Sequence, residues 1–248
     1  MIPKIANFVW LDSPLPDWAR RNIESFAKHN DDYEIRVHFD EELIAEKYKP
    51  LAAKSPRPVT RSDFVRYSIL QAEGGVYFDT DIYHFRPLLD LADVGGRIAC
   101  VNIIEGVPCI CGMAAAPGAA GWRAIDEYLF EHQPLRLIYS ESTTAIIAAA
   151  RAAPENYCPL PGEWTIGRRE DFYLYAKIHE LPVGDIEARD AAEPGGLTGV
   201  HLGAGGAWEM IPRRLADAEF CVKSYRPKDD RQPIRRATSA AARRSSSA

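Results

Sequence analysis

The segment from Thr60 to Asp81 constrains the fold more than any other part of the chain, because it predicts a helix, a tight reversal and a strand in direct succession. We expect a helix from about Arg61 to Glu73, with Thr60 as its N-cap and Gly74 as its stop. Residues 76–78 then read as a strand. The helix would be roughly 20 Å long at about 1.5 Å per residue, similar to a strand running from 76 to 81. The start of the helix should therefore lie beside the end of the strand.

This geometry predicts that polar side chains converge at one edge of the sheet, namely Ser62, Asp63 and Arg66 from the helix and Asp79 and Asp81 from the strand. Open α/β sheets bind their ligands at the carboxyl ends of strands. In an extended strand the two aspartates would point to the same side, roughly 6.6 Å apart. Direct ligation of one ion by both requires the chain to bend at Thr80; otherwise one carboxylate binds through water. Oxygen ligands of this kind favour Mn²⁺ or Mg²⁺ together with diphosphate oxygens.

Each of these residues also has an ordinary structural explanation. An isolated Asp-x-Asp is most often a turn or a pair of surface carboxylates. Asp63 could be the partner of a Thr60 cap, and Arg66 could simply pair with Asp63 at i, i+3. The combination favours a site, because an apolar strand leads directly into two carboxylates whose mutual repulsion a cation would relieve.

The rest of the chain predicts an α/β fold with a largely parallel sheet flanked by helices. Further strands are expected at residues 5–10, 33–39, 98–103 and 110–115, and further helices at 17–28, 41–48, 121–131 and 142–153. After residue 154 the pattern is weaker and rich in turns. We expect one domain over residues 1–225 and a basic, disordered tail over 226–248.

Charge separates the tail from the body. The net charge is −5, but residues 226–248 carry seven Lys or Arg and two Asp, so that the body carries −10. An acidic body argues against nucleic acid as the main ligand. The tail is either a solvated extension or a basic arm for nucleic acid or for peripheral contact with anionic membrane lipid. No apolar run approaches the roughly 20 residues of a membrane span, and the first residues do not resemble a secretory signal, so we expect a cytoplasmic protein.

The five cysteines do not predict a disulfide framework or a zinc site. Cys109 and Cys111 form the one close pair, and they lack the Cys-x-x-Cys or histidine partners of a zinc ligand set. We expect the cysteines to be small buried apolar residues.

Residues 61–67 and 74–81 resemble the donor-site signature of the Asp-x-Asp (DXD) sugar transferases. This family includes the yeast initiating mannosyltransferase, the capsular polysaccharide transferases and the glucosylating clostridial toxins. The N-terminus is similar as well, with Ile2-Pro3-Lys4-Ile5 leading to Val9-Trp10, followed by Pro16-Asp17-Trp18 and Ile23-Glu24-Ser25-Phe26. Together these stretches span about the first third of the chain.

The resemblance implies a GT-A nucleotide-binding fold and a retaining transfer from a UDP- or GDP-sugar to a glycan or lipid-linked acceptor. The donor site would consist of Val9, Trp10, Ser62, Asp63, Arg66, Tyr77, Asp79, Thr80 and Trp208. Within it, Trp10 would stack on the base, and the metal would be held by Asp79, Asp81 and His201. Asp63, Arg66, Asp79 and Asp81 would form the catalytic set. One departure is Ala207, which stands where the family usually has a hydroxyl-bearing residue, and which removes the metal contact expected from that position.

Two other functions remain open from the sequence. One is a phosphohydrolase in which Asp79 forms an aspartyl-phosphate, although such enzymes carry their Asp-x-Asp on the first strand. The other is a binding module for nucleotide-sugars or glycans that retains the site but catalyses no transfer.

Overall fold

The computed structural model describes residues 1–11, 14–55, 57–104, 107–131, 141–166, 183, 184, 186, 188 and 198–202. Within them, six strands form the central sheet, in the order β2 (Glu34–His38), β1 (Ile5–Val9), β3 (Gly75–Phe78), β6 (Val107–Ala115), β5 (Ile98–Ile104) and β7 (Tyr157–Pro159). Strand β1 is parallel to β2 and β3, and β5 is parallel to β7, whereas β6 is antiparallel to both of its neighbours. A smaller sheet contains β4 (Ile82–His84), β9 (Gly199–His201) and β8 (Trp164–Ile166).

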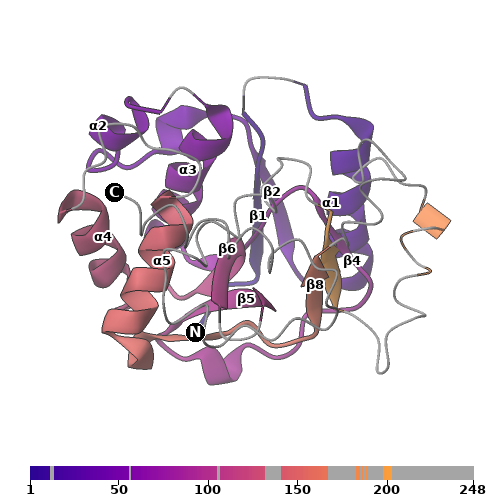
Figure 1. Ribbon diagram of the computed structural model, residues 1–248. Coiled ribbons are helices and arrows are strands. Elements are labelled where there is room, and N and C mark those ends of the chain that lie inside the picture. The colour runs from indigo at the N-terminus through magenta and orange to yellow at the C-terminus, as the bar shows by residue number, and fades with distance from the viewer. Residues whose placement is uncertain are drawn as a thin grey trace, which may run out of the picture.

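Helices cover both faces of the central sheet (Figure 1). On one face lie α2 (Lys49–Ala52), α3 (Pro58–Ala72), α4 (Trp122–Glu131) and α5 (Glu141–Ala152), and on the other lies α1 (Asp17–His29) beside the small sheet. Alternate strand residues therefore enter two separate cores. Tyr77, for example, packs under α3, while Val76 and Phe78 pack under α1. The predicted class, a mixed and mostly parallel sheet flanked by helices, is confirmed.

The reversal between α3 and β3 depends on its two glycines. Gly74 and Gly75 have φ values of +71° and +101°, which side chains disfavour. A Cβ at Gly75 would also lie 2.5 Å from the Ile5 carbonyl oxygen, so only glycine lets β3 approach β1 this closely. The reversal places α3 against β3, as the sequence predicted.

The predicted start of the helix before Gly74 is wrong. Helix α3 begins at Pro58 with Arg57 as its N-cap, so Thr60 lies inside the first turn and does not cap it. Proline suits this position because it has no N–H to leave unpaired. As a result Asp63 is not the partner of a Thr60 cap.

The predicted helix at 41–48 is also wrong. A short 3₁₀ helix (Glu41–Leu43) is followed by a turn, and α2 starts only at Lys49. The Ala45 N–H donates to the Ser68 hydroxyl at 2.8 Å instead of to a helical carbonyl, so the backbone turns away and Ile44 becomes buried.

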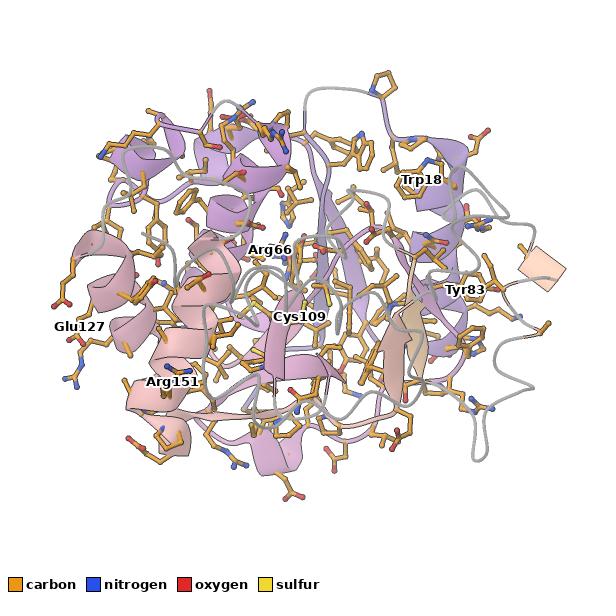
Figure 2. The ribbon with its side chains drawn as sticks, in the orientation of Figure 1. Trp18, Arg66, Tyr83, Cys109, Glu127 and Arg151 are labelled. Carbon is orange, nitrogen blue, oxygen red and sulfur yellow. The ribbon has the colours of Figure 1, made fainter. Side chains whose placement is uncertain are left out.

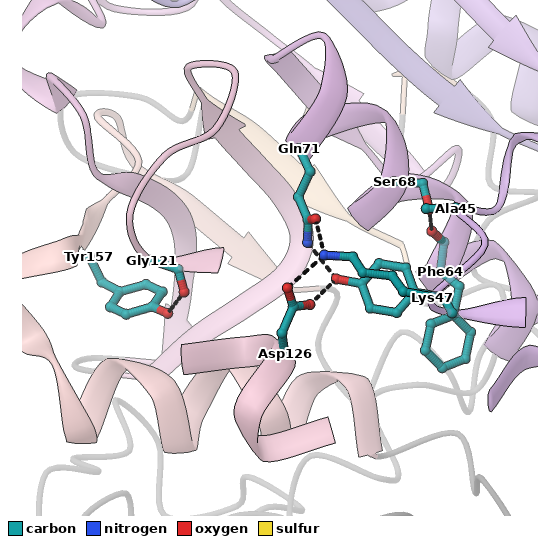
Figure 3. A network of polar contacts seen from close by, with 9 residues as sticks. Ala45, Lys47, Phe64, Ser68, Gln71, Gly121, Asp126 and Tyr157 are labelled. Atoms are coloured by element: carbon teal, nitrogen blue, oxygen red, sulfur yellow. Dashed lines mark hydrogen bonds and ion pairs between the residues drawn. The ribbon is translucent and has the colours of Figure 1, made fainter. Parts of the chain in front are cut away.

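The far end of α3 is fixed by a polar network (Figure 3). The Lys47 ammonium donates to Gln71 Oε1 and to Asp126 Oδ2, each at 2.6 Å. The buried Tyr48 hydroxyl donates to Asp126 and accepts from Gln71. This network ties the C-terminal end of α3 to α4. It stabilises the fold and does not contact the predicted site.

Cys100 and Cys111 are buried, as predicted, and Cys109 and Cys158 are partly buried; these four are free thiols. Cys221 and the tail from 226 to 248 lie outside the described residues, as does most of the turn-rich region after 166.

A buried histidine lies in the core between α1 and the central sheet. The His84 ring packs against the rings of Phe78, Phe26 and Trp164, with centroids 4.6, 5.0 and 5.8 Å away. Both of its nitrogens are buried without a hydrogen-bond partner among the described residues. Burial lowers the pKa of His84 from 6.5 to about 3, so the ring is neutral in the folded protein.

We expect the protein to lose stability in acid, because the folded protein holds His84 in its neutral form. Between pH 6.5 and 3 the unfolded chain binds a proton at this residue that the folded protein does not. His84 alone should therefore lower the free energy of unfolding by about 1.4 kcal/mol for each pH unit below 6.5. Urea unfolding of the wild type and of His84→Phe at pH 7, 5.5 and 4.5 measures the effect, because phenylalanine fits an aromatic cage and does not titrate. Parallel pH curves for the two proteins would contradict the assignment.

Candidate functional site

The middle of α3 and the end of β3 meet around a buried arginine, Arg66, which is labelled in Figure 2. Its Nη2 lies 2.7 Å from Asp63 Oδ1 and 3.0 Å from Asp79 Oδ1, and its Nη1 donates to the Ile110 carbonyl at 2.5 Å. Asp63 and Arg66 are 4% and 3% exposed, so this is a buried ion pair and not a surface one. The predicted convergence of helix and strand is confirmed for these three side chains.

The Arg66 guanidinium and the Tyr77 hydroxyl both keep their protons in this cluster. Burial alone would lower the pKa of Arg66, but Asp79, Tyr77 and Asp63 around it raise the pKa well above its usual value. The Arg66 guanidinium lies 4.3 Å from the centroid of the Tyr77 ring. Burial raises the pKa of Tyr77, so its hydroxyl keeps its proton and donates to Asp79 Oδ1 at 2.7 Å. One oxygen of Asp79 is thus oriented by both Arg66 and Tyr77.

Asp63 is oriented from a second helix as well. The Ser142 hydroxyl of α5 donates to Asp63 Oδ2, and the Tyr67 hydroxyl donates to the Ser142 carbonyl at 2.7 Å. The sequence analysis missed Ser142, because a serine at the start of a helix is ordinary and nothing in the sequence links it to residue 63. The pair between Asp63 and Arg66 at i, i+3 does form, but it belongs to a cluster that extends to β3 and α5.

The chain bends at Thr80, which is the condition that direct ligation of one ion by both carboxylates requires. Strand β3 ends at Phe78, and the Ile82 N–H donates to the Asp79 carbonyl at 3.1 Å, which closes a turn over residues 79–82. The two carboxylates therefore do not have the spacing of an extended strand. Burial raises the pKa of the nearby Cys111 thiol, and Cys109 and the negative charges of Asp79 and Asp81 raise it further.

The remaining predicted residues vary in their surroundings. The Val9 side chain is buried in the core under α3, so a contact of Val9 with a donor would involve its backbone. Trp10 follows β1, is partly exposed, and packs edge-on against Trp18 with ring centroids 5.5 Å apart. The Ser62 hydroxyl donates to the Val59 carbonyl within its own helix. Thr80 is 7% exposed.

The backbone of His201 lies next to the turn. In the pairing of β9 with β4, His201 is opposite Ile82, and the Leu202 N–H donates to the Asp81 carbonyl at 2.8 Å. Segments about 120 residues apart in sequence thus meet at the turn. The His201 side chain and Trp208 lie outside the described residues.

The site suits a divalent cation by the chemistry of its donors. Asp79 and Asp81 offer carboxylate oxygens, the ligands preferred by Mg²⁺ and Mn²⁺. Among the described residues no three His, Cys, Asp or Glu side chains form a group that could hold a metal alone. Such a set is not required, because Mg²⁺ is commonly held by one or two carboxylates and substrate phosphates.

The sequence analysis also missed Asn22, a fully buried residue of α1 whose Nδ2 donates to the Thr80 carbonyl at 3.0 Å. A signal was present, because Trp18, Asn22 and Phe26 are spaced by four and place a polar side chain on the apolar stripe of the helix.

Comparison with known proteins finds a match over the segment that contains most of this cluster. Residues 16–97, a third of the chain, match the family model described as "Glycosyltransferase sugar-binding region containing DXD motif". No curated protein matches the sequence significantly.

Several solved structures are similar in overall arrangement. The PaToxG glycosyltransferase is 14% identical, with 62% of this chain and 70% of that chain covered and a TM-score of 0.46. Mouse xyloside xylosyltransferase 1 is 9% identical, with 79% and 96% covered and a TM-score of 0.46. The galactosyltransferase LgtC, in complex with donor and acceptor sugar analogues, is 10% identical, with 91% and 98% covered and a TM-score of 0.42. Similarity at this level does not transfer an activity from one chain to another.

The match over residues 16–97 covers α1, α3, β3 and the turn at 79–82, so it contains the whole buried cluster described above except Ser142 and Ile110. The resemblance read from the sequence is confirmed over residues 16–97, which match the DXD sugar-binding region of glycosyltransferases.

Proposed function

We propose that the protein is a metal-dependent, retaining glycosyltransferase that moves a sugar from a UDP- or GDP-sugar to a glycan or lipid-linked acceptor. The observation that carries this proposal is the buried cluster of Asp63, Arg66, Tyr77 and Asp79, directly before a bent Asp-Thr-Asp turn. Buried charges are costly unless they are paired. A cluster of this kind at the carboxyl end of a central strand is therefore better explained by ligand binding than by stability alone.

In this proposal the residues of the site divide the work of binding the donor and the cation. Asp63 accepts hydrogen bonds from the hydroxyls of the donor sugar, and Arg66 balances the charge of Asp63 and Asp79 beside the diphosphate. Asp79 and Asp81 would hold Mn²⁺ or Mg²⁺, with His201 as a further ligand. A divalent cation there would neutralise charge on the departing diphosphate. The partly exposed Trp10 offers a flat surface for the base, with Trp18 packed edge-on against its ring.

The transfer itself requires no enzyme nucleophile in this scheme. The bond between the anomeric carbon and the phosphate oxygen breaks, and the acceptor oxygen forms its bond on the same face. The acceptor proton passes to an oxygen of the leaving phosphate. The protein's contribution is to orient the donor and to stabilise the charge that develops.

Incubation with a panel of nucleotide-sugar donors tests the proposal. The purified protein is incubated with UDP- and GDP-sugars with Mn²⁺, with Mg²⁺ and with EDTA, and the released nucleotide is measured. We expect release from one donor, dependent on the metal. Metal-dependent binding of a nucleotide-sugar without turnover with any acceptor would favour the binding module. The absence of both hydrolysis and nucleotide binding would contradict the donor site.

The phosphohydrolase is not supported by the structure. Its nucleophile would be Asp79, but such enzymes carry their Asp-x-Asp on the first strand, whereas Asp79 follows β3. The match to a sugar-binding region over residues 16–97 also points elsewhere.

We further propose that the protein acts in the cytoplasm on polysaccharide or glycolipid synthesis, in peripheral contact with a membrane through its basic tail. No helix among the described residues has the length and apolarity to cross a membrane. The charge of residues 226–248 supports attraction to anionic lipid. Sedimentation of the protein with anionic vesicles, with and without residues 226–248, tests whether the tail binds the membrane. Equal recovery of both proteins with the vesicles would exclude a role for the tail in membrane binding.

A further inference from the structure

Three different elements hold the backbone of the Asp-Thr-Asp turn. The Asp79 N–H donates to the Cys111 carbonyl of β6 at 2.7 Å, and the Asp81 carbonyl accepts from the Leu202 N–H after β9 at 2.8 Å. The Thr80 carbonyl, between them, accepts at 3.0 Å from the side chain of Asn22 on α1. The first two bonds are made by backbone groups and survive any substitution other than proline. The third depends on one side chain.

The peptide held by Asn22 is the one that a turn can rotate most easily. The turn runs from Asp79 to Ile82, and its central peptide joins the Thr80 carbonyl to the Asp81 N–H. Rotation of this peptide interconverts type I and type II turns and leaves the ends in place. The same rotation changes the φ of Asp81 and redirects its side chain. A hydrogen bond to the Thr80 carbonyl therefore fixes the direction of the Asp81 carboxylate.

The surroundings of Asn22 keep its donor turned toward Thr80. Its Oδ1 accepts from Nε and Nη2 of Arg21, at 3.2 and 3.1 Å. This leaves the Nδ2 group to face the turn. Asn22 is fully buried, and Thr80 is 7% exposed, so water cannot readily replace the amide.

A neighbouring residue makes a comparable bond without reaching the turn. Ser25, one turn further along α1, accepts at its hydroxyl from the His84 N–H at 2.9 Å and is 6% exposed. It holds β4 to α1 as Asn22 holds the turn to α1. Ser25→Ala is therefore a matched control, because it removes a buried hydrogen bond that does not involve the turn at 79–82.

We infer that Asn22 is a positioning residue that locks the central peptide of the turn and so sets the affinity of the donor site for its divalent cation. This inference rests on the proposed function, since it assigns Asp81 to the metal. Asn22 touches neither the donor nor the cation in this scheme. It acts through the orientation of Asp81.

The experiment compares Asn22→Ala and Ser25→Ala with the wild type in two measurements. The first is hydrogen exchange of the protein without metal or nucleotide, followed over peptides that span 79–84. The second is titration with Mn²⁺ in the presence of UDP or GDP, read by the electron paramagnetic resonance of free Mn²⁺. Thermal unfolding is recorded for all three proteins, and we expect both variants to lose roughly 2–4 °C in Tm.

Asn22→Ala is expected to speed exchange at Ile82 and to weaken Mn²⁺ binding about 10- to 100-fold, the range for residues that orient metal ligands. In turnover, the Mn²⁺ concentration for half-maximal rate should rise while kcat at saturating Mn²⁺ changes little. Ser25→Ala should lose similar stability and keep the wild-type affinity for Mn²⁺.

The outcomes separate the two levels of the proposal. Equal Mn²⁺ affinities in Asn22→Ala and Ser25→Ala, with a wild type that binds the metal, would overturn the role of Asn22 and leave the donor site intact. A wild type that binds no Mn²⁺ with either nucleotide would overturn the donor site and the inference together. Faster exchange at Ile82 with unchanged affinity would show that the bond holds the turn but does not set metal binding.

Discussion

Replacing Arg66 by methionine is expected to lower the free energy of unfolding by roughly 3–5 kcal/mol, the cost of leaving a buried charge without its partner. The Asp63 and Asp79 side chains are 6% and 25% exposed, and both lie within 3.0 Å of the guanidinium. Methionine has nearly the same reach but no charge, so the two carboxylates would face each other uncompensated. Urea unfolding at pH 7 measures the change.

A second arginine on the same helix provides the control. Arg61 pairs with Glu41 at 2.6 Å, but their side chains are 18% and 38% exposed. Arg61→Met should therefore cost less than about 1 kcal/mol, as for other pairs near the surface. The double variant Arg66→Met/Asp63→Asn should recover part of the loss, because it removes one unpaired charge. If Arg66→Met and Arg61→Met were equally stable, the cluster would not be the buried, tightly paired group described here.

The second large effect is on activity. Asp81→Asn is expected to lower kcat/KM for metal-dependent donor hydrolysis roughly 10³-fold, equivalent to about 4 kcal/mol of transition-state stabilisation. Asparagine keeps the size of the side chain but carries no charge to bind the cation, so the fold should be retained. The measurement is release of UDP or GDP from the donor identified in the panel, over a range of Mn²⁺ concentrations.

Asp126→Asn is the matched control for a carboxylate outside the site. Asp126 belongs to the network with Lys47 and Tyr48 at the other end of α3, so its loss should affect stability and leave the dependence on Mn²⁺ unchanged. Activity of Asp81→Asn within a few-fold of the wild type would contradict the assignment of Asp81 to the metal.

Local sequence was sufficient to predict the elements that have a strong and continuous hydrophobic pattern. The helix before Gly74, the strand after Gly75 and the two carboxylates that follow could be placed because apolar periodicity, two glycines and a helix length fix their relation. The sequence failed at 41–48, where a helix was expected. There the Ser68 hydroxyl takes the Ala45 N–H, and no pattern within residues 41–48 records a partner that lies more than twenty positions away.

The sequence by itself determined the sheet-and-helix class, the convergence of Asp63, Arg66 and Asp79, and the family resemblance, because each depends on residues close together along the chain. Only the tertiary structure decided that the chain bends at Thr80, that Ser142 orients Asp63, and that Asn22 and Leu202 hold the turn. The contacts made by Ser142, Asn22 and Leu202 join residues 58 to 121 positions apart. Their partners are selected by how the helices and the second sheet pack, and packing is a property of the whole fold that no local pattern contains.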